Sequence, residues 1–248
     1  MASVFRSGNP ALSDSVLEKA DRTEGTTMTA AGAVNRTLLL FGLLMLTSAF
    51  SWYAYTAFPA LNGVLWIGGA IGGFVVALVT IFKKTWSPVT APIYALLEGL
   101  FIGGISAMYA AAFEGIVFQA VGLTLGVLLI MLVLYKTGVI VVTKKFAMGV
   151  VAATGAVALL YIVSFGMQLL GFGHIGFIHD SGIFGIIFSV VVVVIAALNL
   201  VLDFDFFDKG EQAGLPAYME WYAAFGIMVT LIWLYLEILR LLAKLRRR

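Results

Sequence analysis

Apolar residues along the chain gather into long, unbroken runs separated by short polar stretches. A hydrocarbon core about 30 Å thick needs roughly 20 apolar residues in an α-helix, so each run is long enough to cross a bilayer. The runs lack the alternation that a membrane barrel would impose, which predicts helices throughout. The fold expected is an all-α integral membrane protein, a bundle of seven transmembrane helices. The predicted spans are Thr37–Ala57, Leu61–Phe82, Pro92–Ala112, Ile116–Tyr135, Phe146–Leu170, Ile183–Leu202 and Trp221–Leu242.

The two ends of the chain are polar. Residues 1–36 contain no apolar run, which predicts a cytoplasmic tail without a cleavable signal peptide. The seven spans make one transmembrane domain over residues 37–242, and residues 243–248 form a basic carboxyl-terminal tail.

The composition also indicates a protein embedded in a lipid bilayer. Hydrophobic residues make up 62% of it and charged residues 11%, with a mean hydropathy of +1.05, which leaves too little polar surface for a water-soluble domain. The absence of cysteine excludes disulfides, thiolate metal sites and cysteine nucleophiles. A net charge of +2 is too small to indicate nucleic acid as a partner.

Lys and Arg residues indicate the orientation, because short cytoplasmic loops are enriched in them. With the amino terminus inside, ten fall on the cytoplasmic side and five on the other, so we expect a cytoplasmic amino terminus. The carboxyl-terminal Arg residues then lie on the unfavoured side, so either the rule is broken there or a late segment is re-entrant. The cytoplasmic set is Arg6, Lys19, Arg22, Arg36, Lys83, Lys84, Lys136, Lys144, Lys145 and Lys209, and the other set is Arg240, Lys244, Arg246, Arg247 and Arg248.

Small residues recur at every fourth position in several spans, a spacing that lets helices approach closely. The spacing occurs as Gly68/Gly72 and Gly69/Gly73 in the second span and as Gly122/Gly126 in the fourth. The longest stripe, in the third span, is Ala91, Ala95, Gly99, Gly103, Ala107 and Ala111. These stripes predict close helix packing and do not by themselves indicate a pore.

Glu98 is an acidic residue inside the third span, with no Lys or Arg within a helical turn. An ionisable side chain in lipid costs about 2.5 to 3.5 kcal/mol or more, so it needs a partner or a function. Two interpretations stay open: a partner from another helix, or a protonated carboxyl satisfied locally by Tyr94 and Tyr109.

The end of the sixth span is also acidic. Asp203 comes one turn after Asn199 and shares its face, whereas Asp205 points to the opposite side. Both would lie with Glu98 toward the cytoplasmic side, where close carboxylates could share protons or hold a cation. This predicts a proton-sensitive cation site. The alternative is a wet interfacial cap, which is the interpretation for Asp208, Glu211 and Glu220.

Other chemical signatures are weak. Glu237 and Arg240 lie three residues apart, which predicts a local ion pair near a helix end. His174, His179 and Asp180 share a Gly-rich outer loop, but their spacing matches no zinc motif, so no metal or other cofactor is predicted. Gly104 to Ser106 forms a Gly-x-Ser without a base in reach, and nothing indicates an enzyme.

Several segments together resemble one family. They are NPALS, MTAAGAVNRTLLL, APIYALLEGLFIGGISAMY, NLVLDFDFF and MEWYAAFGIMVTLIWLYLEILRLL. In these the chain is similar to the Bax-inhibitor superfamily, the transmembrane Bax-inhibitor-motif proteins, in its bacterial YccA-like division. The resemblance covers nearly the whole chain. It implies a last helix surrounded by the other six and a bacterial inner-membrane location.

The resemblance also implies a pH latch, in which two aspartates from spans six and seven share a proton and open on its loss. Asp203 or Asp205 matches the first aspartate, but Thr230 stands at the expected place of the second. Threonine cannot titrate, so Glu98 or Glu237 would have to substitute.

Two functions are therefore expected. The first is a pH-sensitive cation leak, with transient Ca²⁺ as the permeant ion and Asp203, Asp205 and Glu98 as gate carboxylates. Asn199, Thr230, Glu237 and Arg240 would support that site. The alternative is a non-conducting regulator or adaptor that binds a membrane-bound protease or another membrane protein.

Overall fold

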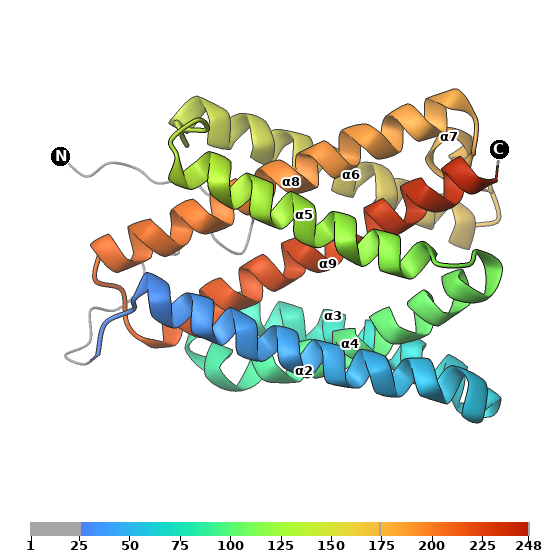
Figure 1. The fold of residues 1–248 in the computed structure, drawn as a ribbon, viewed down its shortest axis with the longest axis horizontal. Coiled ribbons are helices and arrows are strands. Elements are labelled where there is room, and N and C mark those ends of the chain that lie inside the picture. The colour runs from blue at the N-terminus through green and yellow to red at the C-terminus, as the bar shows by residue number, and fades with distance from the viewer. Residues whose placement is uncertain (1–25, 174, 248) are drawn as a thin grey trace.

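The structure is a computed structural model, which describes residues 26–173 and 175–247. Within these ranges it is helical, and seven helices are long and apolar enough to cross a membrane, so its main surroundings are a lipid bilayer. Figure 1 shows them as one bundle. The long helices are α2 (Ala30–Ala57), α3 (Pro59–Phe82), α4 (Ser87–Ala112), α5 (Ile116–Lys136), α6 (Lys144–Leu169), α8 (Ile183–Gln212) and α9 (Tyr218–Arg246), and two short ones are η2 (Lys84–Trp86) and α7 (Gly176–His179).

The predicted spans are confirmed, but several helices run past the apolar runs that identified them. Helix α2 begins at Ala30 rather than Thr37, because the Thr29 hydroxyl caps it by accepting from the Gly32 amide at 2.9 Å. Helix α8 continues to Gln212 instead of ending at Leu202, and Gly214, with φ of 64°, follows its end. An apolar run measures the lipid-facing length, whereas capping and turn residues set where a helix stops.

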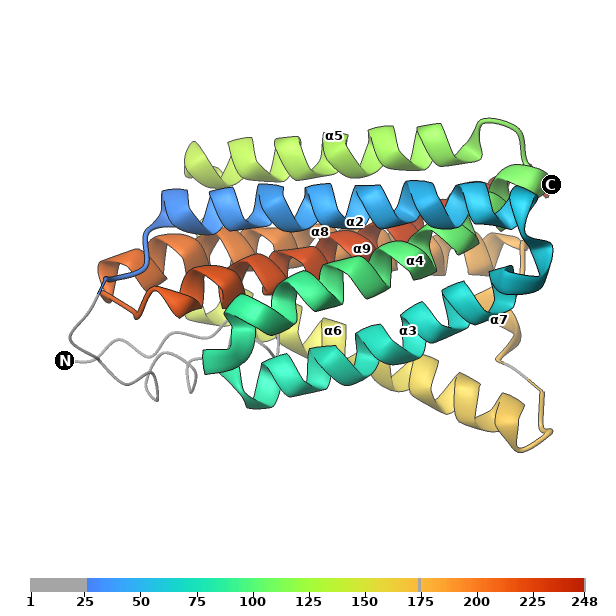
Figure 2. The same ribbon diagram turned by 90° about the horizontal axis from the view of Figure 1, so that it is seen from below.

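Helix α9 is the centre of the bundle, as expected. The buried share of the most apolar stretch is 67% in α9, 50% in α8, 44% in the η2–α4 segment and 17–22% in the other spans. It packs against α2, α4, α5 and α8. In Figure 1 it lies between a group made of α2, α3 and α4 and a group made of α5, α6 and α8. In Figure 2, α2 and α5 lie on one side of it and α3 and α6 on the other.

The small-residue stripe of α4 packs on α2. A Cβ added to Gly103 would collide with the Ser48 backbone. The Ser48 hydroxyl donates to the Gly99 carbonyl at 3.0 Å, and the Ser51 hydroxyl donates to the Leu100 carbonyl at 2.7 Å. This close approach confirms the prediction for the third span.

The same spacing is misleading in α5. A Cβ added to Gly122 or Gly126 would meet nothing within 4 Å, so the predicted close packing there is wrong. In α3 the prediction holds for Gly69, where a Cβ would meet the Leu97 carbonyl at 2.6 Å, but not for Gly68, where a Cβ would meet nothing within 4 Å. Glycine spacing alone does not tell a packed face from a face turned to lipid.

The helices alternate in direction, so the bundle has two distinct ends. We call the end where α2 begins the N-side and the end where α9 finishes the C-side (Figure 1). Helices α8 and α9, of 30 and 29 residues, each cross the whole bundle, so neither is re-entrant. The basic end of α9 therefore lies at the opposite end of the bundle from Arg36. Lys and Arg are thus not confined to one side of the bundle, and the last helix is the exception to that pattern.

Replacing Gly103 by Ala should destabilise the bundle by about 1 to 3 kcal/mol, because the new methyl group has no space between α4 and α2. Gly122→Ala is the matched control, because its Cβ would point into open space and the change also raises helix propensity. Thermal unfolding in detergent measures both. Equal melting temperatures for the two variants would contradict the packing described here.

Candidate functional site

Asp203 is buried in the inner part of the bundle, on α8. Its exposed fraction is 0%, and that of Asn199, one turn earlier, is 2%. The Asn199 amide donates to the Thr154 hydroxyl of α6 and to the Ile195 carbonyl, both at 2.8 Å. The predicted shared inward face of Asn199 and Asp203 is confirmed, and Asp203 sits away from lipid and water.

The next two aspartates of α8 have cationic partners near the N-side. Asp205 pairs with Lys209 at 2.6 Å, and Asp208 pairs with Lys136 at 3.1 Å. The Tyr135 hydroxyl also donates to Asp208 at 2.9 Å. With side-chain exposures of 16% and 29%, these two carboxylates lie closer to the surface than Asp203 does.

Glu98 lies on the other side of the central helix, on α4. It is 9% exposed, and its carboxylate lies against α3, where a Cβ added to Gly73 would meet Oε1 at 2.6 Å. Tyr94, one turn earlier, packs its ring on Phe225 of α9 at 4.9 Å between centroids. The acids proposed from sequence therefore come from two helices that both pack against α9. Among the described residues, the structure does not bring Asp203, Asp205 and Glu98 together into a group that could hold a metal ion.

Thr230 is buried in α9 at 3% exposure, and its hydroxyl donates to the Gly226 carbonyl one turn earlier at 3.4 Å. The hydroxyl therefore has its hydrogen-bond acceptor within its own helix. A hydroxyl in this position supplies a hydrogen-bonding group but no charge in the pH range of a carboxylate.

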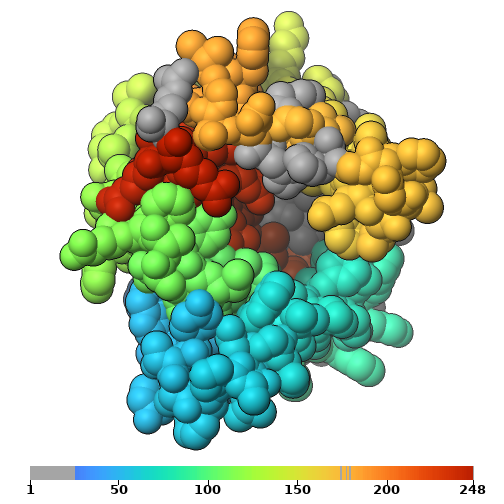
Figure 3. All heavy atoms as spheres, turned by 90° about the vertical axis from the view of Figure 1, so that its right-hand side faces the viewer, coloured from blue at the N-terminus to red at the C-terminus, as the bar shows by residue number. Residues whose placement is uncertain are grey.

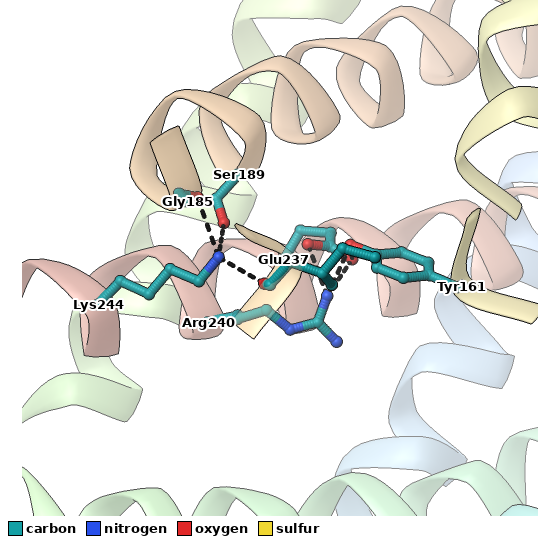
Figure 4. Close-up of polar contacts among 7 residues, drawn as sticks. Tyr161, Gly185, Ser189, Glu237, Arg240 and Lys244 are labelled. Atoms are coloured by element: carbon teal, nitrogen blue, oxygen red, sulfur yellow. Dashed lines mark hydrogen bonds and ion pairs between the residues drawn. The ribbon is translucent and has the colours of Figure 1, made fainter. Parts of the chain in front are cut away.

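Glu237 and Arg240 form the predicted local ion pair, and Tyr161 of α6 completes it (Figure 4). Arg240 Nη1 donates to the Glu237 carboxylate at 2.8 and 3.0 Å and to the Tyr161 hydroxyl at 2.7 Å, while Tyr161 donates to Glu237 at 2.8 Å. The Glu237 side chain is 2% exposed and that of Arg240 31%. The sequence pointed to the pair but not to Tyr161, which is far away along the chain.

Lys244 is a buried cation that the sequence assigned to the terminal tail. It lies inside α9 at 4% exposure. Its Nζ donates to the Ile178 carbonyl at 2.7 Å, the Gly185 carbonyl at 2.9 Å and the Ser189 hydroxyl at 2.8 Å (Figure 4). These contacts tie the C-side of α9 to α7 and α8.

Glu220 has a structural position at the N-side. Its carboxylate accepts from the Thr29 amide and hydroxyl, each at 3.1 Å, and lies 3.7 Å from Arg36. The residue is 9% exposed and ties the first turn of α9 to the first turn of α2. The interpretation of Glu220 as a wet interfacial cap is therefore wrong, because this buried residue links the first and last helices of the bundle.

The loop with His174, His179 and Asp180 is only partly described. His174 lies outside the described residues, and His179 is the last residue of α7. Among the described residues, no three His, Cys, Asp or Glu side chains are grouped closely enough to hold a metal ion.

Fold and site together define a class: a multi-pass membrane protein of seven helices, whose buried central helix carries ionisable groups. Residues 9–247 match the family described as Bax inhibitor 1 like, and the chain belongs to this family. No curated protein matches the chain, and no solved structure matches it.

Glu237→Gln should destabilise the protein by about 3 kcal/mol, because it leaves the largely buried Arg240 without its carboxylate. The matched control is Asp208→Asn, which breaks a more exposed pair and should cost under about 1 kcal/mol. Chemical unfolding in detergent measures both losses. A smaller loss for Glu237→Gln than for Asp208→Asn would overturn the assigned importance of this network.

Proposed function

We propose that the chain is a pH-sensitive cation leak pathway with Ca²⁺ as the permeant ion, a YccA-like member of its family without enzymatic activity. The observation that carries this proposal is the complete burial of Asp203 on α8, a helix packed against the central α9. A carboxyl group in such a place is costly in lipid-embedded proteins unless it serves folding or function.

The physical reason for pH sensitivity is the cost of an ionised carboxylate away from water. A neutral Asp203 suits the dry, closed bundle, whereas an ionised Asp203 favours conformations in which water or a cation reaches it. Rising pH should therefore shift the population toward a hydrated bundle. A carboxylate that attracts hard cations would then lie on the route that the ion takes.

Polar groups distributed along α9 could contact the cation at further points along such a route. Thr230 is one of them, and Tyr235 shares a 2.6 Å hydrogen bond with Ser106 of α4. Glu237 follows toward the C-side, where a cavity of about 140 Å³ is lined by Arg240 and Lys244 among others. This cavity is small and lined by cations, so it does not form a cation channel across a hydrocarbon core of about 30 Å, and this conformation is the closed state in our proposal.

The acidic residues have different parts in this proposal. Asp203 is the titrating gate group. Asp205, held by Lys209, and Glu98, on the far side of α9, are the further acids that a hydrated pathway would expose to cations. Thr230 in place of a second latch aspartate leaves Asp203 as the principal titrating group at this depth.

We also propose the setting of this activity. The N-side, with Arg36, Lys136 and Lys209, faces the cytoplasm, and the protein lies in the bacterial inner membrane with its amino-terminal tail inside. The proposed membrane domain runs from Ala30 to Arg246, so that Lys244 belongs to it and not to a basic tail, and the residues before Ala30 are the proposed cytoplasmic tail.

Asp203→Asn should flatten the pH dependence of Ca²⁺ entry into proteoliposomes between about pH 5 and pH 8, because the amide cannot ionise. In the wild type, entry should rise severalfold over this range. The readout is a Ca²⁺ dye enclosed in the vesicles.

Asp208→Asn is the matched control, because it removes the same charge from the same helix at a partly exposed ion pair. It should keep the wild-type pH profile. A wild-type profile in Asp203→Asn would eliminate Asp203 as the gate. No flux from the wild type at any pH would favour the alternative, a non-conducting regulator that binds another membrane protein such as a membrane-bound protease.

A further inference from the structure

The C-side of α9 ends in a small polar cavity. Its volume is about 140 Å³, and Tyr109, Arg240, Ala243, Lys244 and Arg247 line it. Figure 3 looks onto this end of the molecule and shows a hollow beside the last turns of α9. Three of the five lining residues are cations, which sets this place apart from the acid-bearing α8.

The positive charge of this cavity is only partly neutralised within the protein. Glu237 is the ion-pair partner of Arg240. Lys244 donates its three hydrogen bonds to two carbonyls and a hydroxyl, all neutral, and Asp180 acts on it electrostatically from an exposed position. Arg247 stacks over the Phe113 ring at 5.8 Å. The cavity therefore keeps an excess of positive charge.

The donors are held in place before any ligand arrives. Lys244 is fixed by its three acceptors, and Arg240 is fixed through Nη1, which donates to Glu237 and Tyr161. The other N–H groups of Arg240 belong to a side chain that is 31% exposed. Preorganised guanidinium and ammonium groups suit a multivalent oxyanion, because a guanidinium can offer two parallel hydrogen bonds to phosphate oxygens.

We propose that this cavity binds a phosphate group, either as inorganic phosphate or as the headgroup of an anionic phospholipid. The volume fits a single phosphate group. A position at the end of a membrane-spanning helix is also where lipid headgroups lie. The carboxyl end of a helix by itself disfavours anions, so affinity here must come from the N–H groups of Arg240 and Arg247 and from the Tyr109 hydroxyl. Lys244 adds its charge but no hydrogen bond, because its three N–H groups are already donated within the protein.

Arg247→Gln tests the site, because Arg247 lines the cavity and is an exposed residue without a hydrogen bond that holds helices together. The full chain is placed in phosphatidylcholine nanodiscs and titrated with inorganic phosphate at constant ionic strength. In a second arm, retention of phosphatidylglycerol against phosphatidylcholine is measured by native mass spectrometry. Saturable binding in either arm identifies the source, and Arg247→Gln should weaken it about tenfold.

Arg246→Gln is the matched control, because it removes the same charge from the neighbouring residue. Arg246 is not among the residues that line the cavity, and it donates to the Glu114 carbonyl and the Gln119 side chain. It should change the affinity less than about twofold. Tyr109→Phe, which keeps every charge, should weaken binding a few-fold and reports on the site even if Arg247→Gln disturbs the helix end.

Three results would overturn the proposal. One is the absence of saturable binding in both arms. Another is an equal loss for Arg247→Gln and Arg246→Gln, which would indicate diffuse attraction to a basic end. The last is wild-type affinity in Tyr109→Phe together with wild-type affinity in Arg247→Gln.

Discussion

Burial of the last helix is the constraint on which the rest of this structure depends. Helix α9 carries Glu220, Thr230, Glu237, Arg240 and Lys244 through the middle of an apolar bundle. Lipid cannot satisfy these groups, so their partners must come from the protein, and Thr230 alone of the five has its partner only within α9. Neighbouring helices and caps supply partners for the others. Thr29 and Arg36 of α2 do this for Glu220, Tyr161 of α6 for Glu237 and Arg240, and the α7–α8 region for Lys244. The polar groups of α9 thus help to determine where the surrounding helices pack against it.

The two sides of the bundle differ in charge, and this difference organises its proposed chemistry. On α8, Asp203 is buried, and Asp205 and Asp208 pair with lysines closer to the N-side surface. On the C-side, Arg240, Lys244 and Arg247 line a cavity. Carboxylates attract cations, whereas a basic pocket attracts oxyanions. The same bundle therefore carries one region suited to cations and another suited to anions.

The sequence predicted the helices well because each apolar run must match the bilayer thickness, a local property of the chain. It placed the ends of α2 and α8 less well, since the Thr29 cap and the acidic turns of α8 lie outside the apolar runs. Glycine spacing predicted the contact of Gly103 with α2 but failed at Gly122, because a spacing does not say which face meets a helix. The central place of α9 was expected from the family resemblance, not from periodicity.

Within the candidate site, the predictable contacts were those made along one helix. The Glu237–Arg240 pair and the shared face of Asn199 and Asp203 follow from helical geometry. Tyr161 and the carbonyl partners of Lys244 come from distant parts of the chain, so no local pattern could indicate them. Lys244 looked like part of a solvated tail because a basic run near a chain end gives no sign of burial.

The central claim is that the charge state of Asp203 controls the access of water to the middle of the bundle. A single cysteine tests it in this cysteine-free chain: Ala223→Cys lies on α9 at 0% exposure, and Val139→Cys, at 70% exposure, serves as the reference. The measurement is the rate at which a water-soluble thiol reagent modifies position 223 in membranes, divided by the rate at position 139 at the same pH. The account predicts a low ratio near pH 5 that rises severalfold near pH 8 and stays low when Asp203 is replaced by Asn. A ratio that is independent of pH, or that rises equally in the Asp203→Asn background, would contradict it.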